Sequence, residues 1–242
     1  LARHIPDEYC TEIAAMSRFC THDFDFIGGP YLRQLNYHAA HDIGHAMQSY
    51  MLVGCTSFGA WGEAAAEGMI VGRNFDFYVG DGFARNRLLT FCYPDTGYRF
   101  VSIGWPGMVG VLSGMNEAGL TVTLNAARGP VPLSSATPVS ILARKILQYA
   151  ATIDEACAIA AEYRIFVSES FLIGSARDAK CAVIEKTPER QALHTVPGQT
   201  IGCTNHFQSE AFADDAYNRE NIALSDSKPR AERLAELLDH SI

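Results

Sequence analysis

The sequence has no apolar run of the length that a membrane-spanning helix needs. Its longest apolar runs, such as Met108–Leu112 and Leu120–Leu124, fall far short of the roughly 18–20 residues that cross a bilayer. Positive charge is also scarce, because 19 Lys and Arg stand against 27 Asp and Glu, for a net charge of −8. No basic stripe follows any segment. We therefore expect no membrane span and no nucleic-acid partner.

Motifs for metals and nucleotide cofactors are missing as well. No two cysteines have the C-x-x-C spacing of a zinc site or a thioredoxin-type redox site. The 20 glycines form neither a G-x-G-x-x-G motif nor a phosphate loop, and there is no H-E-x-x-H pattern. The sequence therefore predicts neither a metal nor a cofactor.

What the sequence does have is apolar residues and an odd number of thiols. The 242 residues are 48% hydrophobic and 19% charged, which predicts one large core rather than a disordered chain. The seven cysteines are Cys10, Cys20, Cys55, Cys92, Cys157, Cys181 and Cys203. Most are expected to be small buried hydrophobes. At least one is unpaired even if the others form disulfides, so one of them is a candidate nucleophile.

The order of the hydrophobic patterns predicts an α+β fold. Two helices are expected first, over Asp7–Phe19 and from Pro30 to about Met51, and a helical pair is expected from Thr137 to Tyr163. A further helical pattern closes the chain. The expected strands are Cys55–Trp61, Met69–Phe77, Leu88–Tyr93, Arg99–Trp105, Met108–Met115, Leu120–Ala126, Ser170–Ser175, Cys181–Lys186, Ala192–Val196 and Ile201–His206. This order is typical of antiparallel sheets covered by helices.

The first two strands predict a hairpin that brings a thiol near a carboxylate. If its turn is centred between Ala65 and Ala66, Cys55 faces Asp76, with Cβ atoms about 4.5–5.5 Å apart. A slip of one residue would spoil this register. The alternative interpretation is an ordinary buried cysteine beside a strand-end aspartate.

Four segments in order carry a family resemblance. They are GCTSFGAW (54–61), GRNFDF (72–77), GMNEAGL followed by LN (114–120 and 124–125), and CTNHF (203–207). This set resembles the penicillin acyltransferase-like family (the acyl-coenzyme A:isopenicillin N acyltransferase type) of N-terminal-nucleophile hydrolases, and is more distantly similar to the choloylglycine hydrolases. The match runs from Cys55 to about Leu238. It implies a four-layer α-β-β-α sandwich over residues 55–242, preceded by a helical pro-segment over residues 1–54.

The resemblance also implies a precursor that cuts itself between Gly54 and Cys55. The cut frees an α-amine on the same residue as the thiol. An α-amine titrates near ~8 and a thiol near ~8.5, so the amine can take the thiol proton at neutral pH. The thiolate then attacks an acyl carbonyl and forms a thioester, which water or an amine resolves.

The partners of the nucleophile are implied residue by residue. Asp76 matches the aspartate that orients the cysteine and its amine, and Arg73 matches the neighbouring arginine. Because positions 73 and 76 of a regular strand point to opposite faces, the strand must end or bulge near 74–76. Asn205 matches an oxyanion donor, and Asn125 matches a second position that completes this hole. Arg230 falls where the family has a site arginine, although Pro229 stands where a serine usually precedes it, and Arg233 competes for the assignment.

Several other residues leave alternatives open. The histidines at 38, 41 and 45, with Asp42 beside them, lie on one helix face, which fits a metal site or, as we prefer, packing of the pro-segment against the core near Cys55. His206 fits a papain-like Cys–His pair without self-cleavage. Gly104–Met108 reads as a loop over an acyl pocket or as a plain surface turn. A catalytically silent binding protein is the third alternative.

The preferred interpretation is a self-processing cysteine amidohydrolase that acts on N-acyl amide bonds, with acyl transfer as a variant. Its partners would be small N-acyl amides or acyl thioesters, and the family covers β-lactam precursors, acylated amino acids and lipid amides. A homo-oligomer and either compartment, exported or cytoplasmic, stay open. Because the chain begins at Leu1 and ends in a helical pattern, Arg230–His240, without a capping signal, we expect that its native start and last strands are missing.

Overall fold

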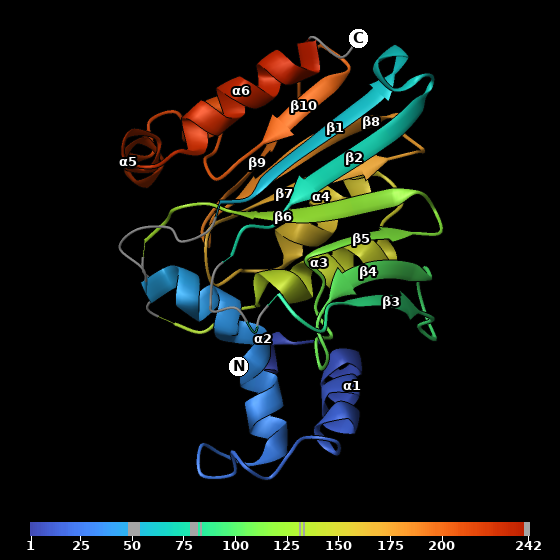
Figure 1. Ribbon diagram of the computed structural model, residues 1–242, viewed down its shortest axis with the longest axis vertical. Coiled ribbons are helices and arrows are strands. Elements are labelled where there is room, and N and C mark those ends of the chain that lie inside the picture. The colour runs from blue at the N-terminus through green and yellow to red at the C-terminus, as the bar shows by residue number, and fades with distance from the viewer. Residues whose placement is uncertain (48–53, 78–81, 83, 131, 133, 240–242) are drawn as a thin grey trace.

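A computed structural model describes residues 1–47, 54–77, 82, 84–130, 132 and 134–239, and places them in two stacked sheets with helices outside them (Figure 1). The larger sheet has the strand order β3-β4-β5-β6-β7-β8-β9, and the smaller has the order β10-β1-β2. All of their pairings are antiparallel. The α+β class predicted from the sequence is therefore confirmed.

The elements follow the predicted order closely. The helices are α1 Asp7–Ser17, α2 Pro30–Met47, α3 Val139–Tyr149, α4 Ile153–Glu162, α5 Ala216–Leu224 and α6 Ser227–Asp239. The strands are β1 Thr56–Gly62, β2 Gly68–Asn74, β3 Leu88–Cys92, β4 Phe100–Gly104, β5 Ser113–Asn116, β6 Leu120–Ala126, β7 Glu169–Ser175, β8 Lys180–Lys186, β9 Gln191–His194 and β10 Thr200–Cys203. The last residues of the predicted second helix lie outside the described residues.

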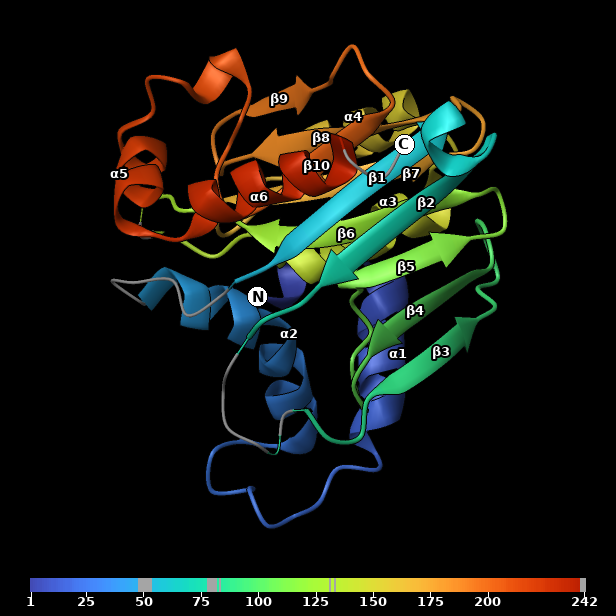
Figure 2. The ribbon, with the colours of Figure 1, turned by 45° about the horizontal axis from the view of Figure 1, so that its top comes forward.

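The layers are helix, sheet, sheet, helix, as Figure 2 shows from a second side. Alternation along β7 explains the stacking: Phe171 and Ile173 pack in the core under α3 and α4, and Leu172 packs in the core that faces the small sheet. Helix α6 covers the outer face of β10. This is the four-layer α-β-β-α arrangement expected from the sequence.

The hairpin of β1 and β2 has a register one residue away from the predicted one. Thr56 pairs with Asn74 and Gly62 with Gly68, so the turn is centred on Ala65 itself. Five residues close the turn, and the backbone there has positive φ at Gly62, Ala66 and Glu67. The predicted pairing of Cys55 with Asp76 is therefore wrong. Position 76 instead lies opposite Gly54, whose N–H donates to its carbonyl oxygen at 2.8 Å.

The predicted strand Met108–Met115 is also shorter than expected, because β5 begins only at Ser113. The backbone before it finds partners on helices instead of strands. The N–H of Val109 donates to Nε2 of His38 on α2, and the N–H of Val111 donates to the carbonyl of Ser140 on α3. A Cβ at Gly110 would lie 2.5 Å from Oγ of Ser140, so only glycine allows this close approach.

The two N-terminal helices pack on the sandwich through a polar contact as well as a small apolar core. Both guanidinium nitrogens of Arg144 on α3 donate to the carboxylate of Glu12 on α1, at 2.7 and 2.8 Å. Tyr9 and Ile13 on α1 are fully buried beside Leu35 on α2. A bidentate pair of this kind fixes orientation as well as distance. The N-terminal segment is thus an integral layer beside α3.

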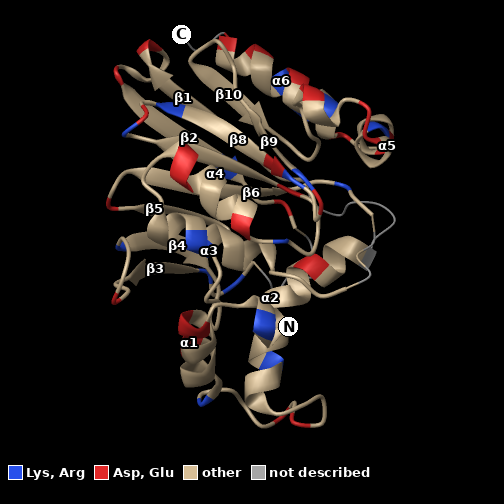
Figure 3. Ribbon diagram, turned by 180° about the vertical axis from the view of Figure 1, so that it is seen from behind, with Lys and Arg blue, Asp and Glu red and all other residues tan. Residues whose placement is uncertain are grey.

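In Figure 3, Lys and Arg (blue) and Asp and Glu (red) are interspersed along the tan ribbon, in keeping with the mixed charge of the composition. Of the helices that the structure describes, none is long and apolar enough to cross a membrane.

Candidate active site

Cys55 lies directly before β1, at the end of the hairpin where the two sheets meet. Its side chain is 1% exposed and packs with Ala126 at the end of β6 and with Phe75 and Phe77. All seven cysteines are free thiols. The candidate nucleophile is therefore a buried thiol at the junction of the N-terminal segment and the first strand.

Arg73 brings a positive charge to this thiol. It pairs with Ser57 in the hairpin, and its guanidinium lies 3.6 Å from Sγ of Cys55. The same group donates to Oγ of Ser113 at 3.1 Å and to the carbonyl of Leu124, and it stacks on the ring of Phe75 at 4.3 Å. These contacts from three elements hold the charge against the sulfur.

The surroundings of Cys55 push its pKa in opposite directions. Burial is the largest effect and raises the pKa of the thiol, because the thiolate would lose its hydration. Arg73 lowers this pKa, Glu169 raises it, the backbone N–H of Asp76 lowers it, and the Asp76 carboxylate raises it. The net direction is upward, so the thiol of the uncut chain stays protonated at neutral pH.

Asp76 lies on the other side of the expected cleavage position. Strand β2 ends at Asn74, as was required for Arg73 and Asp76 to reach the same site. A Cβ placed on Gly54 would lie 3.4 Å from Cβ of Asp76 and 3.8 Å from its Oδ2. The Asp76 side chain therefore lies next to Gly54, at an exposed position.

Arg230 connects Cys55 to Asn205. Its guanidinium donates to the carbonyl of Cys55 at 2.6 Å, to Oγ1 of Thr56 at 2.9 Å and to Oδ1 of Asn205 at 2.8 Å. Arg233 instead has a 67% exposed side chain, which pairs with Glu236. Of the two arginines named from the sequence, Arg230 is the one at the site.

Asn205 and Asn125 are both fully buried, but they lie differently. The Nδ2 of Asn205 donates to the carbonyl of Ala126 at 2.8 Å, beside Cys55. The amide of Asn125 is held between the small sheet's strands: its Oδ1 accepts from Ser57 at 2.9 Å and its Nδ2 donates to the carbonyl of Cys203 at 3.1 Å. Asn125 thus ties β6 to β1 and β10.

His206 belongs to a different hydrogen-bond network. Its Nδ1 lies 2.7 Å from Oγ of Ser227 and 3.2 Å from Oγ1 of Thr204. Burial and the charges of Arg230 and Lys228 lower its pKa. Among the hydrogen bonds of the described residues, none joins His206 to Cys55, so the geometry gives no support to a papain-like pair.

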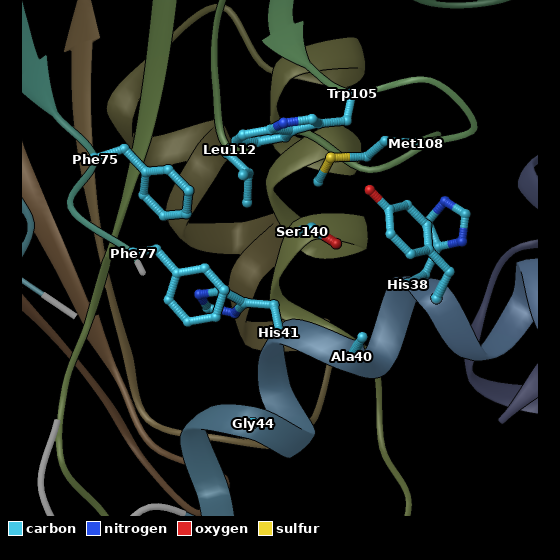
Figure 4. A pocket seen from close by; sticks show the side chains of 11 residues that line it. His38, Ala40, His41, Gly44, Phe75, Phe77, Trp105, Met108, Leu112 and Ser140 are labelled. Atoms are coloured by element: carbon cyan, nitrogen blue, oxygen red, sulfur yellow. The ribbon is translucent and has the colours of Figure 1, made fainter. Parts of the chain in front are cut away.

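A cavity of about 350 Å³ is lined in part by Phe75 and Phe77 (Figure 4). The same two rings pack against the small cluster of Cys55 and Ala126, so they connect the cavity to the surroundings of the thiol. Its remaining lining is Tyr37, His38, Ala40, His41 and Gly44 from α2, together with Trp105, Met108, Leu112 and Ser140. The segment Gly104–Met108 is therefore the wall of an apolar pocket rather than a plain surface turn.

The histidines of α2 pack against neighbouring segments. Nε2 of His38 accepts from the backbone of Val109, and the His41 ring lies 5.5 Å from that of Phe77, as Figure 4 also shows. Burial lowers the pKa of His45 to about 3, which keeps it neutral. Over the described residues no group of His, Cys, Asp and Glu is arranged to hold a metal.

Two buried polar residues at the site escaped the sequence argument. Ser227, the first residue of α6, accepts from the backbone N–H of Asn205 at 2.8 Å. Glu169, at the start of β7, is fully buried and acts on both Cys55 and Arg73. The signal for Glu169 was present, because an acid opens an otherwise apolar strand; Ser227 had no local signal.

Comparison with known proteins places these features in a family. A family model described as acyl-coenzyme A:6-aminopenicillanic acid acyl-transferase matches residues 64–242. An uncharacterised protein of Archaeoglobus fulgidus is 29% identical over 206 residues, which are 79% of this chain and 34% of that protein. The chain thus spans about a third of the length of this relative.

A solved structure shows the same fold. An N-acylethanolamine-hydrolyzing acid amidase ortholog from Caenorhabditis elegans superposes with a TM-score of 0.50 at 20% identity, over 67% of this chain and 75% of its own. A conjugated bile acid hydrolase from Clostridium perfringens gives 0.46 at 15% identity, over 64% and 55%. At such identities the likeness to the first of these structures concerns the fold alone.

Proposed function

The chain belongs to the acyl-coenzyme A:6-aminopenicillanic acid acyl-transferase family, and on that premise we propose that it hydrolyses or transfers N-acyl groups through a thioester at Cys55. One observation carries the proposal: the sulfur of Cys55 lies 3.6 Å from the Arg73 guanidinium, while Arg230 joins its carbonyl oxygen to Asn205. A buried thiol with a fixed cation on one side and amide donors on the other is arranged for attack on a carbonyl.

The first step of the proposal is self-cleavage before Cys55. The thiol sulfur attacks the carbonyl carbon of Gly54, the peptide C–N bond breaks, and the thiol proton ends on the departing nitrogen. Water then hydrolyses the new thioester, which leaves a carboxylate on Gly54 and returns the thiol. The Asp76 carboxylate, which lies next to Gly54, is the group that we propose to guide the proton.

The second step uses the amine that cleavage creates. The α-amine of Cys55 accepts the thiol proton, and the thiolate attacks the acyl carbonyl of the substrate. The substrate amine leaves with that proton, and water or a second amine then takes the acyl group from sulfur. Asn205 is the proposed donor to the oxyanion, a role worth roughly 10²–10³ in rate. Arg73 stabilises the thiolate, and Asp76 orients the new amine.

The cavity beside Phe75 and Phe77 is the proposed acyl pocket. Its lining is mainly aromatic and aliphatic, which suits an apolar acyl group rather than a charged one. The proposed substrates are therefore small N-acyl amides, with acyl thioesters as acyl donors for transfer. Because α2 supplies one wall, residues 1–54 stay bound after the cut, held by Arg144 and Glu12.

The test combines mass spectrometry with alkylation. We expect the wild-type chain to separate, under denaturing conditions, into fragments broken after Gly54, and Cys55→Ala to remain whole and inactive. Cys92→Ala, at a thiol that is only partly buried, is the control and should process normally. A fully active intact chain, or a Cys55→Ala chain that is still cut after Gly54, would sink self-processing.

Turnover is tested separately, by screening N-acyl amino acids and penicillins for released amine. Iodoacetamide should modify Cys55 faster than the other six thiols once the chain is cut. Equal rates at all seven would refute the activated nucleophile.

A further inference from the structure

Glu169 is a carboxylic acid buried in the core without a hydrogen-bond partner among the described residues. It is the first residue of β7 and is 0% exposed, and neither of its oxygens has a hydrogen-bond partner among the described residues. It pairs in the sheet with Ala126, whose carbonyl accepts from the proposed oxyanion donor Asn205. A buried acid left without partners costs stability, so its place beside the site calls for a reason.

Charged and titratable groups reach Glu169 from four elements. Asp42 on α2 and Arg73 on β2 both act on it electrostatically, and Glu169 in turn acts on Cys55 ahead of β1. Lys186 on β8 is its direct cross-strand neighbour, and no hydrogen bond joins the two side chains among the described residues. The neighbouring strand β6 contributes Ala126, which has no charge.

Of the two buried acids, Asp42 is the better carrier of a negative charge. Its Oδ2 accepts from the N–H of Val139 at 3.0 Å, at the N-terminus of α3, and its Oδ1 faces Nδ1 of His41 at 3.4 Å. Glu169 has no such donors. Burial, with the charge of Asp42 second, raises the pKa of Glu169 well above its ordinary value, although Arg73 opposes this. One negative charge in the pair therefore resides on Asp42.

The charge of Arg73 can stabilise either of two anions, the thiolate of Cys55 or an ionised Glu169. Its guanidinium is fixed by Ser113 and Leu124 at 3.6 Å from the sulfur of Cys55. A negative Glu169 would compete for that charge and would also repel the thiolate directly. A neutral Glu169 does neither.

We propose that Glu169 is a positioning residue of the active site: as the neutral acid it leaves the charge of Arg73 to the thiolate of Cys55. This inference rests on the proposed nucleophile. It predicts that the thiolate becomes harder to form when Glu169 ionises. The acid thereby makes the reactivity of Cys55 depend on a group that does not touch the substrate.

The test measures alkylation of Cys55 by iodoacetamide, peptide by peptide, from about pH 5 to about pH 9, a range that starts above the ordinary carboxyl pKa and includes the ordinary thiol pKa. Wild type is compared with Glu169→Gln, which mimics the neutral acid, in the same cleavage state. We expect equal rates at low pH and a faster variant at high pH, by up to about tenfold for each pKa unit that an ionised Glu169 adds to the thiol. Glu189→Gln, which removes an exposed acid, should follow wild type.

The outcomes separate this inference from the proposed function. If Cys55 of wild type is no faster than the other six thiols at any pH, the proposed nucleophile fails. If Cys55 is the fast thiol but Glu169→Gln follows the wild-type profile, or is slower at every pH, Glu169 has only a structural role. Glu169→Met is the second variant and should show the same divergence. Failure of both variants to fold would also refute a neutral side chain, since both match its size.

Discussion

Replacing Arg230 by lysine tests whether this side chain organises the site. Lysine keeps the charge but loses the planar fork that reaches three acceptors at once. In the structure the fork joins the carbonyl of Cys55, the hydroxyl of Thr56 and the amide oxygen of Asn205, at 2.6–2.9 Å. The contact with Asp226 adds little, because that carboxylate is 72% exposed. We expect Arg230→Lys to cut itself slowly and to turn over slowly.

The size of the effect follows from the bonds lost. Hydrogen bonds from a charged donor contribute about 1.5–3 kcal/mol each, and lysine keeps one of the three. If only the lost bond to Asn205, the proposed oxyanion donor, bears on the reaction, its share of about 1.5–3 kcal/mol raises the barrier, which slows the reaction between about 10-fold and about 200-fold.

The assay follows self-cleavage by mass spectrometry and then turnover of the cut enzyme. Arg233→Lys is the matched control, one turn along the same helix on an exposed side chain, and it should behave as wild type. Wild-type rates in Arg230→Lys, or equal losses in the two variants, would refute the assignment of Arg230 to the site.

Three further predictions follow from other contacts. Ser227→Ala removes the hydroxyl that accepts from the N–H of Asn205, so it should lower both the melting temperature and the turnover rate, with a stability loss of about 1–3 kcal/mol. A lower melting temperature with an unchanged turnover rate would show that Ser227 does not position Asn205. Glu12→Gln breaks the bidentate pair with Arg144, so the N-terminal fragment of the cut enzyme should dissociate at lower urea concentration, seen by size-exclusion chromatography. The raised pKa of Glu169 means that the folded state holds a proton that the unfolded chain releases above about pH 4. Stability should therefore fall as pH rises, by up to about 1.4 kcal/mol per pH unit, and Glu169→Gln should flatten this slope in denaturant titrations.

The sequence predicted the order and type of the elements because hydrophobic periodicity is a local property. It missed the hairpin register because register depends on the parity of the turn. Five residues close the turn, with Ala66 and Glu67 at positive φ, where glycine would be expected instead. A two-residue turn centred between Ala65 and Ala66 would have given the predicted pairing of Cys55 with Asp76.

Helix α2 shows a second limit of periodicity. Its apolar spacing favours one buried face that includes Leu32 and Ile43, but these two side chains are 55% and 43% exposed. The helix also buries His38 and Asp42. These two residues accept hydrogen bonds from the backbone of Val109 and of the first turn of α3, partners more than 60 positions away. No local pattern could reveal them.

The candidate site was easier to predict than this helix, because its motifs stand at strand ends that meet at one edge of the sandwich. Arg73, Asp76 and Asn205 were named from motifs, and the fold brings them to Cys55 and its flanking peptide. Glu169 was missed because it acts on Arg73 and Cys55 electrostatically, from a strand far away in the sequence, and belongs to no motif. The residues of the site that could be predicted are those that lie in short motifs in the expected order along the chain.

The electrostatics of Cys55 explain why the proposed enzyme would need its own cleavage. In the uncut chain burial and the Asp76 carboxylate raise the pKa of the thiol, an ionised Glu169 would raise it further, and only Arg73 and one backbone N–H lower it. The cation alone does not overcome the burial, so the precursor thiol stays protonated. The one group that can take its proton without adding negative charge is an amine on Cys55 itself, which the peptide bond to Gly54 withholds. Cleavage then changes the chemistry of the thiol without rebuilding its surroundings.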